Sequence, residues 1–244
     1  MHKKDITIAT ITLARDEQEE TLMRNALEQL SKLKIPVFIT DGGSRPGFLD
    51  FLRSFPHFIL SKATVKGVWA QAKNSLTEAY QQGSKFIFYT EPDKGDFFAQ
   101  SLPEMLDRVQ TDDKSGIVMA SRSAAAFSTF PAFQQMTETA INNCCAEVVG
   151  KNLEYTYGPF LLNRQLVPYL ALVKEDISWG WRPYVFGTAK RLGYQVESYV
   201  GNFYCPVSQR EDRATERIYR MRQLSQNMQG IVLSATVNLD QITA

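Results

Sequence analysis

Histidine is scarce in this sequence, with only His2 and His57 among 244 residues. Catalytic zinc sites and nucleophilic triads both rely heavily on histidine. The composition therefore argues against a histidine-based zinc centre and against a hydrolase with a histidine base. Cysteine is also rare. None of its three positions has CxxC spacing, so we expect free, buried thiols in a reducing compartment; they are Cys144, Cys145 and Cys205.

Long apolar runs and strong net charge are missing too. No apolar run reaches the roughly 18 residues of a membrane-spanning helix, and the N-terminus lacks the apolar stretch of a signal peptide. The formal net charge is +1 without a long block of like charge, so we expect no nucleic-acid partner. These absences predict a cytoplasmic protein without an integral membrane segment. A homo-oligomer is compatible with the composition.

The glycine-rich loops that bind phosphate in common nucleotide folds are absent. No GxGxxG follows the first predicted strand, and neither GxxxxGK[ST] nor GxSxG occurs. This excludes a typical Rossmann dinucleotide site, a P-loop and an α/β-hydrolase elbow. The segment after the first strand, TLARDEQ, contains no glycine, which argues against a nucleotidyltransferase of the sugar-nucleotide pyrophosphorylase type.

The first half of the sequence alternates between two hydrophobic periods. Short apolar runs predict strands at residues 6–13, 36–40, 57–60, 86–89 and 116–120. Helical spacing predicts helices at residues 17–33, 48–55, 65–82 and 103–109, and Asp16 is a candidate N-cap of the first. Strands separated by helices indicate βαβ units, so we predict an α/β fold with a mainly parallel central sheet flanked by helices.

The second half is less regular. Its pattern predicts helices at residues 131–149, 167–173, 185–192 and 213–228. It predicts strands at residues 160–162, 194–199 and 203–205. No internal repeat or low-complexity linker interrupts the chain. We therefore predict a single domain over residues 1–244, with residues 1–122 as the nucleotide-binding half and residues 123–244 as the acceptor-binding half.

Polar residues follow four of the predicted strands, at the carboxyl ends where ligands bind in open α/β sheets. The clusters are Ala14 to Glu17, Asp41 to Ser44, Thr90 to Asp93, and Ser121 with Arg122. In the third cluster, Glu91 and Asp93 flank a proline. Such a turn is either a solvated loop or a site for a divalent metal. Because three of the four clusters hold acids, we favour the metal site.

These segments resemble, in order, the motifs of the GT-A glycosyltransferases, in particular the family 2 type and its dolichol-phosphate-mannose-synthase-like relatives. TITLARDEQEE is similar to their opening P-x-R/Y-N-E-E, and VFITDGGS to V-x-x-x-D-D-G-S. GVWAQAKNSLTEAY resembles G-x-x-x-A-R-N-x-G-x-x-x-A, and FIFYTEPD resembles the strand that ends in DxD. IVMASRS and KRLGYQVESYV resemble later segments of the family.

The chain departs from this pattern at several positions. Asp16 stands where Asn is usual, Lys73 where Arg is usual, and Glu91 where the first Asp of DxD is usual. The late R-x-x-G-S-K segment of the lipid-linked relatives is absent, and residues 209–213 take its place. These departures leave open a second interpretation, a non-catalytic GT-A-like protein that binds a nucleotide-sugar or serves as a scaffold.

The resemblance implies a GT-A, or nucleotide-diphospho-sugar transferase, fold. It implies a metal-dependent glycosyltransferase of the hexosyltransferase type, which moves a sugar from a UDP- or GDP-sugar to a soluble sugar or small-molecule acceptor. Mg²⁺ or Mn²⁺ would be held by Glu91 and Asp93 of a DXD-like motif and would offset the charge of the leaving diphosphate. The residues expected to bind the nucleotide are Thr12, Ala14, Asp16, Glu17, Asp41, Lys73, Glu91 and Arg122.

Some of these residues have simpler explanations. Asp41 would bind the base of the nucleotide, or would only cap the turn that contains Gly42 and Gly43. Lys73 and Arg122 would reach phosphate or ribose, or would only be solvated charges. The sequence alone leaves both alternatives open.

The acceptor side is predicted from an acidic and aromatic segment. An inverting transferase needs a carboxylate base near the acceptor hydroxyl, and we prefer Asp176 for this role, with Glu175 second. We expect Gly158, Trp179 and Trp181 to bind the acceptor, although both tryptophans would also fit a packed core.

A basic stretch follows late in the chain. Arg210 and Arg213 would close over the diphosphate as a lid, or would belong to a solvated helix face.

Overall fold

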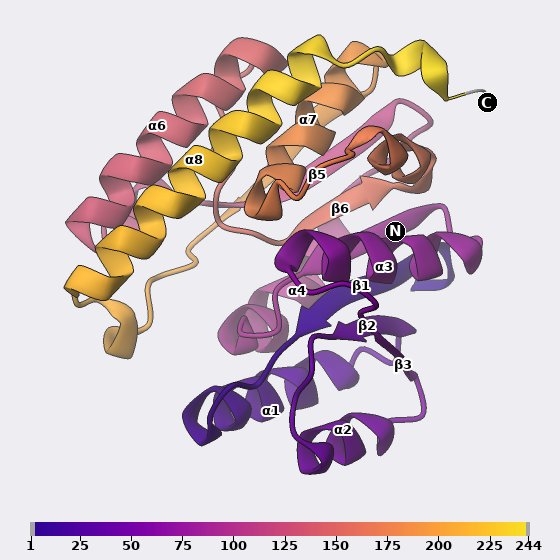
Figure 1. Ribbon diagram of the computed structural model, residues 1–244, viewed down its shortest axis with the longest axis vertical. Helices are drawn as coiled ribbons and strands as arrows, with labels where there is room; N and C mark the ends of the chain where they lie inside the picture. The colour runs from indigo at the N-terminus through magenta and orange to yellow at the C-terminus, as the bar shows by residue number, and fades with distance from the viewer. Residues whose placement is uncertain (1–2, 243–244) are drawn as a thin grey trace. The chain divides into compact units, whose positions relative to one another are not determined.

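The computed structural model describes residues 3–242 and confirms the α/β class (Figure 1). The chain divides into two compact units. One runs up to Thr111 and includes Pro159–Val167, and the other contains Asp112–Gly158 and the chain from Pro168 onward. This grouping differs from the predicted halves, since the boundary precedes residue 122 and a later segment returns to the first unit. The single-domain description stays a prediction.

The first unit is built on five strands. They are β1 (Ile6–Thr12), β2 (Val37–Asp41), β3 (Phe58–Lys62), β4 (Phe86–Thr90) and β6 (Phe160–Asn163). Their order is β3-β2-β1-β4-β6, and every pairing is parallel except that of β4 with β6. All residues of β1, β2 and β4 are buried, as expected for strands with both faces covered. The parallel pairings bring the carboxyl ends of β1, β2 and β4 to one edge.

The helices of the first unit are α1 (Glu17–Ser31), α2 (Pro46–Arg53), α3 (Val68–Gln81) and α4 (Leu102–Arg108). A π-helical turn, Phe97–Ser101, precedes α4, and a 3₁₀ turn, Lys3–Asp5, precedes β1. The N-cap of α1 is Asp16, whose carboxylate accepts a hydrogen bond of 2.8 Å from the Glu19 backbone N–H. The capping role predicted for Asp16 is therefore confirmed.

The described residues of the second unit, which end at Ile242, form a parallel pair of strands and four α-helices. The strands are β5 (Ser115–Arg122) and β7 (Gln195–Gly201). The helices are α5 (Ala124–Phe127), α6 (Ala132–Val149), α7 (Trp181–Arg191) and α8 (Ala214–Thr236). Short 3₁₀ segments lie at Ser178–Gly180, Val207–Gln209 and Leu239–Gln241, and a longer one, Arg164–Leu172, begins in the first unit and ends in the second. None of the helices in residues 3–242 has the length and apolarity needed to span a bilayer.

Small residues allow α8 to approach its neighbours closely within this unit (Figure 1). A Cβ added at Gly230 of α8 would overlap the carbonyl oxygen of Gly180, which lies just before α7. A Cβ at Gly187 of α7 would overlap the hydroxyl of Ser234 on α8. The backbone of α8 at Gly230 therefore contacts the backbone of the turn before α7, and the backbone of α7 at Gly187 contacts the Ser234 side chain of α8.

Most predicted elements are confirmed, with ends that shift by a few residues. The predicted strand at residues 203–205 is wrong: the Cys205 backbone N–H donates to Thr129 Oγ1, and the Phe203 ring stacks on Tyr157. The helix predicted at residues 167–173 is a 3₁₀ segment, Arg164–Leu172, that contains Pro168. The sequence pattern also missed α5 and the π-helical turn.

Candidate functional site

Asp41 ends β2 and is the centre of a buried polar cluster in the first unit. The residue is only 4% exposed to solvent. Oδ1 accepts hydrogen bonds of 2.8 Å from the backbone N–H groups of Gly43 and Ser44. Oδ2 accepts from the hydroxyls of Thr12, at 2.9 Å, and Ser44, at 2.6 Å. The turn-capping role of Asp41 is confirmed, and its contact with a nucleotide base stays a prediction.

The ends of β1 and β2 are fixed to each other by further hydrogen bonds. The Ala14 backbone N–H donates to Ser44 Oγ at 2.8 Å. From α3, Gln71 Nε2 donates to the carbonyl oxygens of Thr12, at 2.9 Å, and Thr40, at 3.2 Å. A side chain at Gly42 would crowd this amide, since a Cβ there would lie 2.8 Å from Gln71 Nε2. Predicted residues Thr12, Ala14 and Asp41 thus form one rigid cluster.

Gln71 was not predicted from the sequence. It joins two strand ends that lie 59 and 31 positions away along the chain. Its position on the mainly apolar, buried face of α3 was the available signal, because a buried amide needs hydrogen-bond partners.

The other polar residues of the predicted nucleotide site have different surroundings. Asp16 and Glu17 are exposed at the start of α1, where Glu17 lies 3.7 Å from the Arg45 guanidinium. Lys73 on α3 places its Nζ over the Trp69 ring, 5.5 Å from the ring centroid. Lys73 is therefore partly covered, although the contact of all three with a nucleotide stays a prediction.

Glu91 and Asp93 follow β4 at the same edge of the first unit. Glu91 is 9% exposed, whereas Asp93 is half-buried and forms an ion pair of 3.1 Å with Lys94. Within residues 3–242, no three His, Cys, Asp or Glu side chains are grouped so that they could hold a metal by themselves. Mg²⁺ is commonly bound by one or two carboxylates plus substrate phosphates, so this donor set fits a metal that arrives with a diphosphate.

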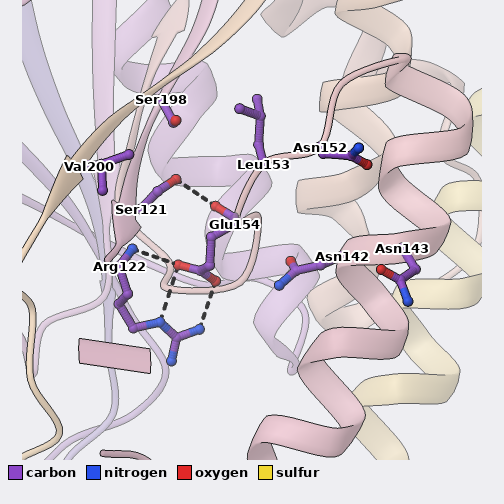
Figure 2. A pocket seen from close by; sticks show the side chains of 9 residues that line it. All are labelled: Ser121, Arg122, Asn142, Asn143, Asn152, Leu153, Glu154, Ser198 and Val200. Carbon is purple, nitrogen blue, oxygen red and sulfur yellow. Dashed lines mark hydrogen bonds and ion pairs between the residues drawn. The ribbon is translucent and has the colours of Figure 1, made fainter. Parts of the chain in front are cut away.

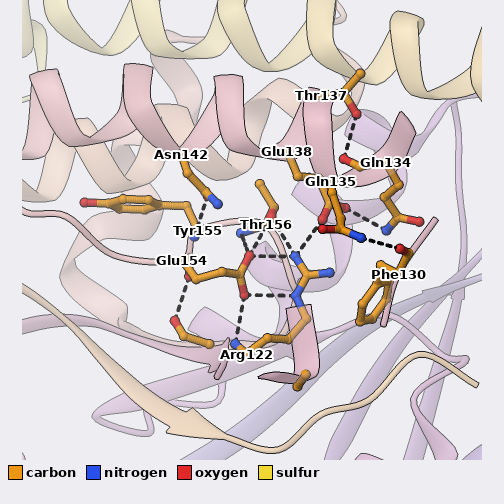
Figure 3. Close-up of polar contacts among 12 residues, drawn as sticks. Arg122, Phe130, Gln134, Gln135, Thr137, Glu138, Asn142, Glu154, Tyr155 and Thr156 are labelled. Carbon is orange, nitrogen blue, oxygen red and sulfur yellow. Dashed lines mark hydrogen bonds and ion pairs between the residues drawn. The ribbon is translucent and has the colours of Figure 1, made fainter. Parts of the chain in front are cut away.

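Arg122 ends β5 in the second unit and has a side chain that is 1% exposed (Figure 3). Its Nη2 donates to Glu138 Oε2 and Glu154 Oε1, both at 2.7 Å, and to Thr156 Oγ1 at 2.8 Å. Its Nε and backbone N–H donate to Glu154 Oε2. The guanidinium also lies over the Phe130 ring, 4.4 Å from the centroid.

These contacts determine the charge state of the cluster. Burial lowers the pKa of Arg122, but the two carboxylates outweigh it and raise the pKa above its ordinary value. Burial raises the pKa of Glu154, yet the Arg122 charge and its hydrogen bonds leave it below the ordinary carboxyl value. The interpretation of Arg122 as a solvated charge is therefore wrong, because two carboxylates hold it in the interior. Its contact with phosphate or ribose stays a prediction that competes with these partners.

The residues predicted for the acceptor side lie in the second unit. Trp181 is fully buried, so its packed-core alternative is correct and its ring has no face open for stacking. Trp179 is partly exposed; its Nε1 donates to the Tyr219 hydroxyl at 2.9 Å, and Arg182 lies over its ring. Gly158 is buried with a φ of 126°, a conformation that glycine adopts without strain.

The two candidate bases are exposed. Glu175 and Asp176 lie in the loop before α7. Asp176 Oδ1 accepts a hydrogen bond of 2.8 Å from the Ser178 backbone N–H, and Ser178 has a φ of 44°. Asp176 therefore stabilises a tight turn, and its role as a base stays a prediction.

The segment with the predicted lid arginines is anchored within the second unit. Arg210 Nε donates to the Cys205 carbonyl at 3.0 Å, and Asp212 accepts a hydrogen bond of 3.0 Å from the Phe133 backbone N–H at the start of α6. Arg213 pairs with Glu211 at 2.8 Å, with both side chains largely exposed. The lid role of Arg210 and Arg213 stays a prediction.

Comparisons with known proteins place this fold. No family model matches the sequence, and no curated protein does either. Solved structures do match. Glucosyl-3-phosphoglycerate synthase from Mycobacterium tuberculosis, in complex with uridine diphosphate, aligns with a TM-score of 0.67 and 12% identity over 93% of this chain and 80% of that one. Its complex with Mn²⁺, UDP-glucose and phosphoglyceric acid aligns with a TM-score of 0.63 and 12% identity, over 93% and 79%.

The chain has the GT-A fold. This agrees with the resemblance seen in the sequence motifs, at the level of the fold. The narrower similarity to dolichol-phosphate-mannose-synthase-like relatives stays a prediction. In the GT-A chain described here, the carboxyl ends of β1, β2 and β4 carry the Asp41 cluster and the two carboxylates Glu91 and Asp93.

Proposed function

We propose that the chain is a metal-dependent glycosyltransferase that moves a sugar from a UDP- or GDP-sugar to a soluble acceptor. The observation that carries this proposal is the pair Glu91 and Asp93 directly after β4, at the strand edge that also holds the Asp41 cluster. The fold similarity supports it, because solved structures with this fold contain Mn²⁺ together with UDP or UDP-glucose.

Glu91 and Asp93 would hold Mg²⁺ or Mn²⁺ together with diphosphate oxygens. The metal would supply positive charge to a leaving diphosphate. Pro92 lies between the two carboxylates and restricts the turn that presents them. Lys94 Nζ lies 3.1 Å from the Asp93 carboxylate and balances its charge before a cation binds, and the ammonium would contact phosphate afterwards.

The protein groups around β1 and β2 would position the nucleotide. The carboxylate of Asp41 and the backbone of Thr12 and Ala14 are held in place by Ser44 and Gln71, so a nucleotide would meet a preorganised surface. Asp176, with Glu175 second, is our proposed base for an acceptor hydroxyl. Cytoplasmic location and a soluble acceptor stay predictions.

Thermal unfolding in the presence of nucleotides tests donor binding. A ligand that binds only the folded state raises the melting temperature. We expect UDP or GDP, but not both equally, to raise it in the presence of Mn²⁺, and Asp93→Ala to abolish the rise. Asp96→Ala is the matched control, because Asp96 is exposed and its side chain makes no capping hydrogen bond. No rise with any nucleotide would contradict the proposal.

The second candidate function is a GT-A protein that binds a nucleotide-sugar without transferring it. The Asp41 carboxylate already accepts hydrogen bonds at both oxygens, and Asp93 is paired with Lys94. Both acids therefore have protein partners, which favours this candidate. It predicts weak or metal-independent nucleotide binding and no release of nucleoside diphosphate from any sugar donor. Metal-dependent release of UDP or GDP, measured by chromatography over a donor panel, would exclude it.

A further inference from the structure

A pocket of about 390 Å³ opens within the second unit (Figure 2). Strands β5 and β7 supply Ser121, Ser198 and Val200 on one side, and α6 supplies Asn142 and Asn143 on the other. The segment Asn152–Glu154 runs between them. The volume lies within the roughly 300–1,000 Å³ that is common for small-molecule sites. Of the residues predicted to bind a ligand, only Arg122 lines this pocket.

The two charged residues in its lining neutralise each other. Arg122 and Glu154 are linked through Nη2 at 2.7 Å, and Glu154 also accepts from the backbone N–H and hydroxyl of Thr156. Glu138 adds a second carboxylate to the same guanidinium, and the Arg220 guanidinium, 3.9 Å from Glu138, supplies a second positive charge. An ionic ligand would therefore meet no uncompensated counter-charge here, and no ionic attraction would offset the cost of its desolvation.

The polar side chains of the lining retain hydrogen-bonding capacity. Within residues 3–242, the structure records no hydrogen bond for the side chains of Asn143, Asn152 and Ser198. Asn142 uses its Oδ1 to accept from the Tyr155 backbone N–H at 2.8 Å, which leaves its amide N–H groups for a ligand. Amides and hydroxyls both donate and accept, as the hydroxyl groups of a ligand require.

Two apolar side chains complete the lining. Leu153 is partly exposed, and Val200 is 61% exposed although it lies on a strand. A ligand that combines hydroxyl groups with C–H faces would satisfy both kinds of surface.

We propose that this pocket binds a neutral polyhydroxylated ligand, a sugar or a polyol, and that it discriminates against anions. All residues that line the pocket belong to the second unit, whereas Asp41, Glu91 and Asp93 of the proposed donor site belong to the first. A neutral ligand would differ in charge from the phosphoglyceric acid that some of the similar solved structures contain. A site for that acid would need a free cation, and Arg122 is not free.

Protein NMR on the complete ¹⁵N-labelled chain tests the proposal without any nucleotide. The probes are D-glucose, D-mannose, D-galactose and glycerol, with 3-phosphoglycerate as the anionic comparison. We expect at least one neutral probe to cause saturable shifts of the side-chain amide signals of Asn143 and Asn152. We expect 3-phosphoglycerate at the same concentration to leave them unchanged.

Three variants localise the binding. Asn143→Ala combined with Asn152→Ala removes two amides that are exposed and without a structural role, and should weaken binding about tenfold. Val200→Trp should fill the pocket from an exposed position and abolish binding. Asn25→Ala, at an exposed asparagine of α1 in the first unit, is the matched control and should leave the affinity unchanged.

Either of two results would overturn the inference: no saturable shift with any neutral probe, or binding that the pocket variants leave intact. Stronger binding of 3-phosphoglycerate than of the sugars would overturn its selectivity. Because no nucleotide or metal is present, these outcomes are independent of whether the chain binds a UDP- or GDP-sugar.

Discussion

Arg122 shows what a single buried charge does in this molecule. Its guanidinium contacts Glu138, Glu154 and Thr156 and lies over the Phe130 ring. Buried ion pairs of this kind add little net stability when both partners are present, but loss of one partner leaves a buried charge uncompensated. The cluster is therefore a point at which small changes have large effects.

Substitution of Arg122 by Met should lower the free energy of unfolding by about 3–5 kcal/mol, because Glu138 and Glu154 would remain buried without a counter-charge. Urea denaturation measures this. Arg108→Met is the matched control: Arg108 pairs with Glu104 on the exposed face of α4, and its loss should cost less than about 1 kcal/mol. Similar losses of unfolding free energy in the two variants would show that Glu138 and Glu154 do not depend on Arg122 for charge compensation.

The Glu154 carboxyl should contribute to the pH dependence of stability. Its folded-state pKa is below the ordinary value of 4.5, because Arg122 outweighs the opposing effect of burial. The contribution is fully present above pH 4.5 and is lost as the pH falls through the lower folded-state value. Denaturation between neutral and acidic pH should show a shallower acid loss in Glu154→Gln than in wild type. The exposed control Glu147→Gln should keep the wild-type slope, and equal slopes in all three proteins would refute the assignment.

Local residue roles were predictable from the sequence, and distant partnerships were not. Asp16 was expected to cap α1 because a cap is decided within three residues. One partner of Arg122, Glu154, lies 32 positions away in an irregular segment, so no spacing in the sequence identifies it. Trp179 and Trp181 look alike in the sequence, but the packing of α7 buries one and leaves the other partly exposed.

At the scale of elements, the contact of α8 with α7 depends on the absence of side chains. The carbonyl of Gly180 occupies the space that a Cβ of Gly230 would need. Alanine is normally favoured over glycine within a helix, so helix propensity alone would stabilise a Gly230→Ala variant. A backbone carbonyl cannot rotate away as a side chain can, and we expect the clash to dominate.

Gly230→Ala should therefore lower the melting temperature and reduce the free energy of unfolding by about 1–3 kcal/mol or more. The control is Gly47→Ala in α2, where a Cβ would meet nothing within 4 Å and helix propensity should act unopposed. Calorimetry should thus show a lower melting temperature for Gly230→Ala than for wild type and a higher one for Gly47→Ala. Equal or stabilising effects would mean that α8 can shift away from α7 without cost.

The elements themselves were predictable where hydrophobic periodicity was strong. The strands of the first unit are short and rich in apolar and β-branched residues, and the helices of this unit have clear apolar stripes, such as Met23, Ala26, Leu27 and Leu30 of α1. The predicted strand at residues 203–205 failed because tertiary contacts with Thr129 and Tyr157 decide its conformation. The start of α7 was placed late because Pro183 and two tryptophans obscure its first turn.

At the scale of the whole molecule, the sequence motifs identified a fold that family comparison of sequences does not detect. The similar solved structures share 12% identity with this chain, so the fold is retained by hydrophobic pattern and turn chemistry rather than by residue identity. The Glu91, Asp93 and Asp41 side chains proposed to bind the sugar donor lie in the first unit, and the pocket proposed to bind a neutral ligand lies in the second. Each can therefore be tested by its own ligand.

Electron paramagnetic resonance of free Mn²⁺ tests the central claim most directly. We predict that the chain binds Mn²⁺ tightly only when UDP or GDP is present, because Glu91 and Asp93 supply two metal ligands and the diphosphate supplies the others. Protein-free nucleotide is the blank. Asp93→Ala should weaken binding at least about tenfold, and Asp96→Ala should not. Mn²⁺ binding that is independent of nucleotide, or unchanged in Asp93→Ala, would contradict the account.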